Sequence, residues 1–277
     1  MSKFLSKTLA AFALTAGLAY AGAASATILV TDNDSDGSFL FDDITYGNGT
    51  GRAFVTPLLF TSDFGNTQPA ATQVGGVHNP GAAGIDYSYG FSTGSGAPVV
   101  NLTYTFANVR DPKAAFPDVN GLRFMLDVTP HGSSVSPTTD KATQNWPGAV
   151  AGDPDKRQIQ DLGAGALNTI LVSNNGVSDG TFSNNCITTG CTTDFGLEWD
   201  RTVLKPGETW TIKVTLVDDP ALVTGGRWLK AESLDGTGNV LVVGNPTLVP
   251  EPGSYAMLLG GIAILVLVSR RRLSALG

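Results

Sequence analysis

An acidic stretch near the N-terminus has the spacing of oxygen ligands for a hard cation. Residues 32–37 read Asp-Asn-Asp-Ser-Asp-Gly, and a further aspartate follows six residues after the glycine. Carboxylates at loop positions 1, 3, 5 and 12, with glycine at position 6, are the pattern of a calcium loop. The spacing predicts Ca²⁺ as a cofactor, held by Asp32, Asp34, Asp36 and Asp43. An Asx-rich turn between two strands is the alternative that the same residues allow.

Two patterns that would support hydrolysis lack the context that hydrolysis needs. Residues 90–94, Gly-Phe-Ser-Thr-Gly, have the spacing of a nucleophile elbow, and His131 follows. An elbow requires a helix directly after the serine, and Pro98 argues against one. Carboxylate pairs could serve a glycosidase only at a defined separation, which the sequence does not fix. These pairs are Asp153 with Asp155, Glu198 with Asp200, and Asp218 with Asp219. We therefore expect no enzymatic activity.

One tryptophan is a candidate platform for stacking against sugars. Trp146 precedes Pro147 in a polar stretch, which favours an exposed ring on a loop. Trp210 instead belongs to the apolar face of an alternating run, so we expect it in the core.

The only two cysteines, Cys186 and Cys191, lie close together in the chain. In an oxidising compartment such a pair is predicted to form a disulfide. The four intervening residues and the lack of a nearby histidine make a redox pair or half of a metal site poor alternatives.

The N-terminus has the three parts of a cleavable export signal. Lys3 and Lys7 precede an apolar run over 9–20, and Ala24-Ser25-Ala26 supplies a small-x-small cleavage site. We predict a signal helix that signal peptidase removes after residue 26.

The C-terminus carries a second targeting pattern. Pro250, Glu251 and Pro252 precede an apolar stretch over 256–268, which the arginine cluster of residues 270–272 follows. The apolar stretch predicts a single transmembrane helix, and the arginines keep its end on the cytoplasmic side. The two prolines hold Glu251 in an extended segment just outside the membrane.

This combination resembles the PEP-CTERM sorting signal of Gram-negative bacteria that make exopolysaccharide. The resemblance is carried by Pro250, Glu251 and Pro252, by the apolar span, and by Arg270, Arg271 and Arg272. It implies that exosortase, a membrane-embedded transpeptidase-like enzyme, recognises the tail and removes it. The final location implied is the cell surface or the extracellular matrix.

The exported body is strongly acidic. All 24 acidic residues but only 12 of the 17 basic ones lie between Thr27 and Pro252, because two lysines precede this segment and three arginines follow it. The resulting formal charge of −12 argues against nucleic acid or an anionic membrane as a partner of the body.

The elements that must position these residues are predicted to be strands. Apolar residues alternate with polar ones over 100–106, 122–128 and 209–216, and glycine, proline and Asx residues interrupt such runs every few positions. Further strands are predicted over 27–31, 39–46, 53–60, 85–91, 167–172, 195–199, 227–234 and 239–243. Residues 205–208 are predicted as a turn, 235–238 as a hairpin turn, and 61–84 and 129–160 as long loops.

These features together predict an all-β chain, an antiparallel β-sandwich or jelly roll. The expected organisation is a signal peptide over 1–26, an exported domain over 27–247 and a sorting tail over 248–277. We expect a structural protein of the cell surface or exopolysaccharide matrix. The alternative is a carbohydrate-binding module or adhesin, and a polysaccharide hydrolase is a weaker one.

Overall fold

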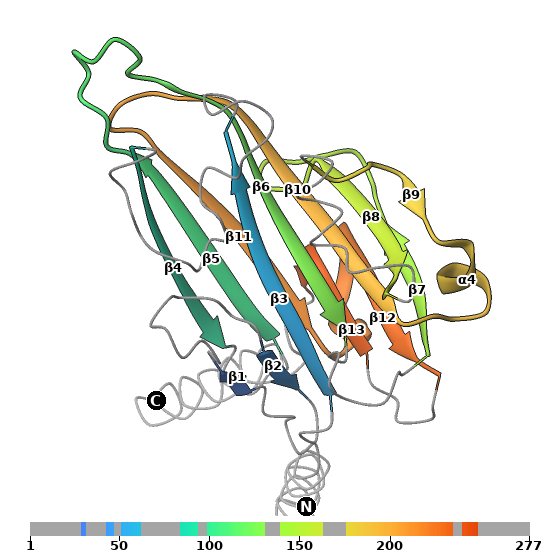
Figure 1. The fold of residues 1–277 in the computed structure, drawn as a ribbon. Coiled ribbons are helices and arrows are strands. Elements are labelled where there is room, and N and C mark those ends of the chain that lie inside the picture. The colour runs from blue at the N-terminus through green and yellow to red at the C-terminus, as the bar shows by residue number, and fades with distance from the viewer. Residues whose placement is uncertain are drawn as a thin grey trace, which may run out of the picture.

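Thirteen strands, one short α-helix and one 3₁₀ helix make up the part of the chain that the structure, a computed structural model, describes (Figure 1). This part comprises residues 29–31, 43–46, 51–61, 84–93, 99–130, 139–162, 176–234 and 240–248. The strands are β1 (Leu29–Thr31), β2 (Asp43–Tyr46), β3 (Gly51–Phe60), β4 (Ile85–Thr93), β5 (Val99–Asn108), β6 (Val119–Pro130), β7 (Asp140–Asn145), β8 (Lys156–Asp161), β9 (Thr181–Phe182), β10 (Thr193–Leu204), β11 (Thr209–Val217), β12 (Val223–Ser233) and β13 (Val240–Leu248). The helices are α4 (Asn184–Thr188) and η3 (Pro220–Leu222).

The strands form two sheets. The seven-stranded sheet has the order β1-β2-β3-β6-β10-β8-β9, and the six-stranded sheet has the order β4-β5-β11-β13-β12-β7. The chain changes sheet five times, between β3 and β4, β5 and β6, β6 and β7, β7 and β8, and β10 and β11. The all-β prediction is therefore confirmed. The pairing is not wholly antiparallel, because β8 and β9 run parallel.

Aromatic rings from both sheets meet in the core between them. Phe124 of β6 lies with its ring centroid 4.7 Å from Tyr104 and 5.4 Å from Phe106, both on β5, and 5.8 Å from Trp199 on β10. Trp210, which the sequence predicted in the core, is partly buried and packs against the core from the periphery, 5.7 Å from Phe106. Tilted ring pairs at these separations are favourable and bury large apolar areas.

Alternating burial explains why these segments are strands. In β5 every second side chain from Val100 to Phe106 is fully buried, while those between remain partly exposed. The predicted strands over 100–106, 122–128 and 209–216 are all observed. The predicted turn after β10 is also present: Glu208 N–H donates to Lys205 O over 2.9 Å, and Gly207 has φ +77°, which favours glycine.

The predicted long loop over 129–160 is wrong, because it contains β7 and nearly all of β8. Ile159 is the one β8 side chain in the main core. Gln158 and Gln160 are buried on the opposite face of the strand, where their amide groups hydrogen-bond over 3.0 Å. A strand that is polar on its buried outer face lacks the apolar alternation by which strands are recognised.

Candidate functional site

The predicted targeting segments lie outside the described residues. These are the signal over 1–26 and the tail residues Pro250, Glu251, Pro252, Arg270, Arg271 and Arg272. Among the residues that are described, we find no helix both long and apolar enough to cross a bilayer. What the structure does place is the junction with the tail: β13, an inner strand of the six-stranded sheet, ends at Leu248. A single residue, Val249, separates this strand from Pro250.

The predicted calcium ligands Asp32, Asp34 and Asp36 also lie outside the described residues. Asp43 is the first residue of β2, and its backbone is in register with Thr31 of β1. The acidic stretch therefore connects two paired antiparallel strands, not two helices as in an EF-hand. The calcium hypothesis stays a prediction.

Calcium binding has a direct thermal test. A cation that binds only the folded state stabilises it by mass action, so we expect the melting temperature in millimolar Ca²⁺ to exceed that in EDTA. Replacing Asp32, Asp34 and Asp36 together by Asn should abolish the difference. Identical melting of the unmodified protein in the two buffers would exclude the site.

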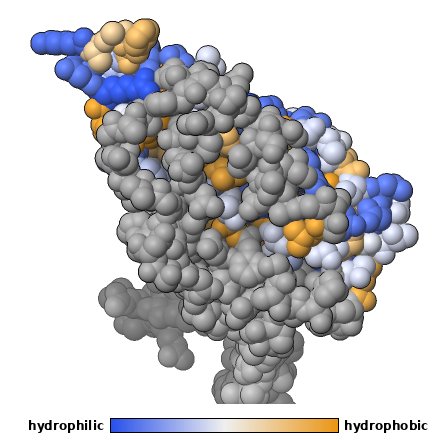
Figure 2. Space-filling model, viewed as in Figure 1, coloured by the Kyte–Doolittle hydropathy of each residue, from blue (hydrophilic) through white to orange (hydrophobic). Residues whose placement is uncertain are grey.

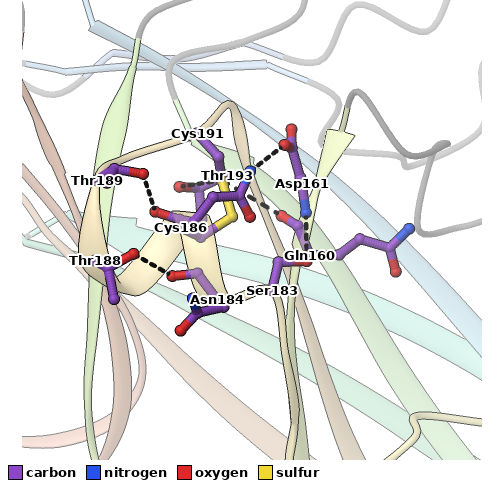
Figure 3. Close-up of a disulfide and its surroundings, with 10 residues drawn as sticks. Gln160, Asp161, Ser183, Asn184, Cys186, Thr188, Thr189, Cys191 and Thr193 are labelled. Carbon is purple, nitrogen blue, oxygen red and sulfur yellow. Dashed lines mark hydrogen bonds between the residues drawn. A yellow bond between two sulfur atoms is a disulfide. The ribbon is translucent and has the colours of Figure 1, made fainter.

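Cys186 and Cys191 form a disulfide bond that fastens α4 to the sandwich (Figure 3). Both cysteines are buried, and Figure 3 shows the sulfurs between α4 and the side chains around Gln160 and Thr193. The backbone of Cys191 exchanges two hydrogen bonds with Asp140, the first residue of β7, at 2.7 and 3.0 Å. The strand that follows this loop, β10, belongs to the seven-stranded sheet, whereas β7 belongs to the six-stranded sheet. The disulfide loop therefore connects the two sheets at one edge.

Removing this disulfide should destabilise the fold measurably. In the chain-entropy model a loop this small contributes about 2 kcal/mol. We expect the Cys186→Ala, Cys191→Ala double variant to lose about this amount in urea denaturation without reductant. The unmodified protein in dithiothreitol serves as the matched comparison and should show a similar loss. Equal stability of all three samples would contradict a structural role.

Glu198 and Asp200, one of the predicted acid pairs, share a single lysine on the outer face of the seven-stranded sheet. Lys156 Nζ donates to Glu198 Oε1 and lies 3.0 Å from Asp200 Oδ2. Val177 N–H donates to Glu198 Oε2 over 2.6 Å. Gly176, at φ +154°, leaves room for the carboxylate, because a Cβ there would lie 2.9 Å from Glu198 Oε2. The cluster pins the segment before β9 onto the sheet.

Burial and hydrogen bonding shift the pKa values of this cluster in different ways. The Glu198 side chain is fully buried, and desolvation raises its pKa to about 6 although Lys156 and the Val177 N–H favour the charged form. Burial also opposes the charge of Lys156, but its hydrogen bonds to Glu198 and Asp200 outweigh that effect and raise the lysine pKa. Glu198 and Asp200 thus both take part in an ion-pair network with Lys156, which supports a structural role for the two carboxylates.

The raised pKa of Glu198 predicts a pH dependence of stability. A carboxyl whose pKa is higher in the folded state contributes fully below its unfolded pKa near 4.5, and this contribution is lost as pH rises through about 6. The change amounts to about 2 kcal/mol. We expect Glu198→Gln to flatten the dependence of the unfolding free energy on pH between pH 4.5 and 7. The control Glu232→Gln, at an exposed glutamate, should leave this dependence unchanged. Parallel profiles for Glu198→Gln and the unmodified protein would refute this assignment.

Asp153 and Asp155 also make contacts that stabilise the fold. The Asp153 side chain is buried and accepts hydrogen bonds from Val150 N–H at 2.8 Å and Asn245 Nδ2 at 3.0 Å. Arg227 Nε lies 4.0 Å from Asp153 Oδ2, the oxygen that also accepts from Val150 N–H. Asp155 Oδ2 accepts from the backbone N–H of Asp200 over 2.7 Å. These contacts fix the loop between β7 and β8.

The third acid pair, Asp218 and Asp219, lies at η3. Asp219 Oδ1 accepts from Ala221 N–H over 2.8 Å and so caps this helix. Ser92 of the Gly-Phe-Ser-Thr-Gly motif lies within β4, in register with Asn101 of β5. It is therefore part of a continuous strand and not of a turn between strand and helix.

The prediction that Trp146 is an exposed platform is wrong. Its ring packs against the core, 4.4 Å from the guanidinium carbon of Arg157 and 4.9 Å from that of Arg227. These arginines come from β8 and β12, one from each sheet. Such cation–π contacts between the two sheets hold the ring in place against the core.

A strongly exposed aromatic ring lies elsewhere. Phe116, between β5 and β6, has 82% of its surface accessible. One phenylalanine among charged and proline residues is an ordinary loop pattern, so the exposure of Phe116 was not predicted from the sequence. Two prolines of the same loop, Pro112 and Pro117, were the only signal that this loop holds a fixed conformation.

Comparison with known proteins identifies the tail. Residues 248–272 match the family model of the PEP-CTERM protein-sorting motif, and the match begins at the last residue of β13. No curated protein and no solved structure matches the chain significantly. The predicted recognition of the C-terminal tail is thereby confirmed. The chain carries a PEP-CTERM sorting motif directly behind its β-sandwich, which indicates an exported protein that exosortase processes.

Proposed function

We propose that this protein is a non-enzymatic structural component of the bacterial cell surface or exopolysaccharide matrix. Signal peptidase would remove residues 1–26, and the C-terminal helix would hold the chain in the inner membrane until exosortase acts at Pro250, Glu251 and Pro252. The observation that carries this proposal is the sorting-motif match over residues 248–272, which adjoins the folded body.

Three features of the body support a structural role. Its two sheets share an aromatic core, and a disulfide joins α4 to their edge. Five of the six carboxylates that sequence alone would allow in catalysis are held by Lys156, by Arg227 and Asn245, or by backbone N–H groups. A body charge of −12 keeps such a protein soluble among acidic surfaces.

The proposal is tested in cells of the producing bacterium. With Pro250, Glu251 and Pro252 replaced by alanine, we expect the full-length chain to accumulate in the inner membrane and to be depleted from the surface and matrix fractions. Glu232→Ala, at an exposed residue of the body, is the control and should be processed normally. Undiminished surface delivery of the triple variant would refute sorting through this motif.

The absence of catalysis is a separate expectation with its own assay. The protein recovered from the cell surface should release no reducing ends from the exopolysaccharide of the same cells. Turnover that Glu198→Gln or Asp153→Asn abolishes, with the fold intact, would show that the body is an enzyme.

A further inference from the structure

The loop between β5 and β6, residues 109–118, projects from one end of the sandwich (Figure 1). Apolar and strongly hydrophilic surfaces lie side by side at its tip (Figure 2). Phe116 and Val109 of this loop are 82% and 55% exposed. Asp111 and Lys113 are exposed on the same loop.

Hydrogen bonds at the base hold this loop in one conformation. The buried Asn108 side chain donates to Pro117 O at 2.9 Å and to Leu204 O at 2.7 Å, and accepts from Arg110 N–H at 2.9 Å. The Arg110 guanidinium in turn donates to Asp118 O. The β5–β6 loop is thereby tied to the end of β10.

The tip has its own turn. Ala114 N–H donates to Asp111 O over 2.9 Å, and Lys113 N–H donates to Asp111 Oδ1 over 2.8 Å. The Phe116 ring is therefore presented on a preorganised support. Because the ring is almost entirely in water, the fold gains little from burying it, and a partner that covers it would bind at a low cost in conformational entropy.

We propose that the β5–β6 loop is a glycan-contacting platform: Phe116 stacks on the apolar face of a pyranose ring, and Asp111 and Lys113 hydrogen-bond to neighbouring hydroxyl groups. The negative face of an aromatic ring attracts the polarised C–H groups of a sugar ring, and exposed charged groups beside it supply donors and acceptors. This proposal rests on the proposed surface delivery only because delivery brings the protein to polysaccharide. The binding itself depends on residues of the exported body.

Charge and size favour a glycan over a lipid bilayer. The body carries −12, which disfavours approach to anionic headgroups. The large apolar side chains that this loop exposes are Phe116 and Val109, a small area for membrane insertion. One aromatic face covers about a single sugar unit, and Asp111 and Lys113 are exposed on the same loop.

The test is retention of the full-length chain, purified in mild detergent, on immobilised exopolysaccharide from the producing bacterium. We expect Phe116→Ala to weaken retention roughly tenfold and Phe116→Tyr to preserve it. Phe91→Ala is the matched control, because Phe91 is a half-exposed phenylalanine of β4, outside this loop, and should bind like the unmodified protein. Soluble oligosaccharides released from the same polymer should elute the unmodified protein.

Each contrary result is decisive. Equal retention of Phe116→Ala and the unmodified protein, or no retention of either, would overturn the platform. If Phe116→Ala instead releases the protein from washed membranes and leaves polysaccharide retention intact, the partner is a lipid surface and the proposal is wrong. Surface delivery is scored separately by cell fractionation, where Phe116→Ala should behave normally. Failure of sorting with intact retention would refute the proposed localisation and leave the platform standing.

Discussion

Replacing Phe124 by alanine should lower the free energy of unfolding by about 3–5 kcal/mol, the usual loss when a fully buried phenylalanine is truncated. The side chain joins the two sheets, since its ring contacts Tyr104 and Phe106 from one sheet and Trp199 from the other. The variant forfeits these ring contacts and leaves a cavity that neighbouring strands fill only in part. Urea denaturation followed by tryptophan fluorescence provides the measurement.

A matched control comes from the same amino-acid type in the opposite environment. Phe116→Ala should change the unfolding free energy by less than about 0.5 kcal/mol, because this ring is 82% exposed. Similar losses for Phe124→Ala and Phe116→Ala would show that the core does not lie where the two sheets meet. The same control also shows that any loss of glycan retention in Phe116→Ala is not caused by unfolding.

Replacing Lys156 by methionine should have the second large effect, and one that depends on pH. At pH 8 the substitution leaves the Glu198 carboxylate buried beside Asp200 without its ammonium partner. We expect a loss of roughly 2–3 kcal/mol, at or below the low end of the range for broken buried pairs, because the Lys156 side chain is one-third exposed. At pH 5 Glu198 is mostly protonated, so the loss should be much smaller.

The control for this prediction is Lys213→Met, at an exposed lysine of β11 on the outer face of the other sheet. Its effect should stay within about 0.5 kcal/mol at both pH values. Urea denaturation at the two pH values measures both variants. A Lys156→Met loss that is the same at pH 5 and pH 8 would show that Glu198 does not control the stability of this cluster.

Strands with one polar and one apolar face were predictable from the sequence. The runs in β5 and β11 alternate strictly, so each specifies both its conformation and the face it buries, and β6 departs from alternation at Met125, which is buried in a second cluster. In contrast, β8 contributes only Ile159 to the core and carries glutamines on its buried outer face. The burial of that face depends on tertiary structure, which no local pattern encodes.

The contacts at the candidate sites also differ in whether the sequence predicts them. Cys186 and Cys191 are close in the chain, so their pairing followed from proximity. Lys156 and Glu198 come together only because β8 and β10 pair in one specific register, and sequence alone does not give that register. The two arginines that cover Trp146 come from strands in different sheets, so the ring looked exposed in the sequence.

The most direct test of the account is the mass of the protein recovered from the cell surface. Intact-protein mass spectrometry should give a chain that begins at Thr27 and ends near Pro250–Pro252, without the apolar span and the arginines of residues 270–272. It should also show two fewer hydrogens than the reduced chain, because Cys186 and Cys191 are bonded. A cytosolic product that retains both termini would contradict export and sorting by this tail.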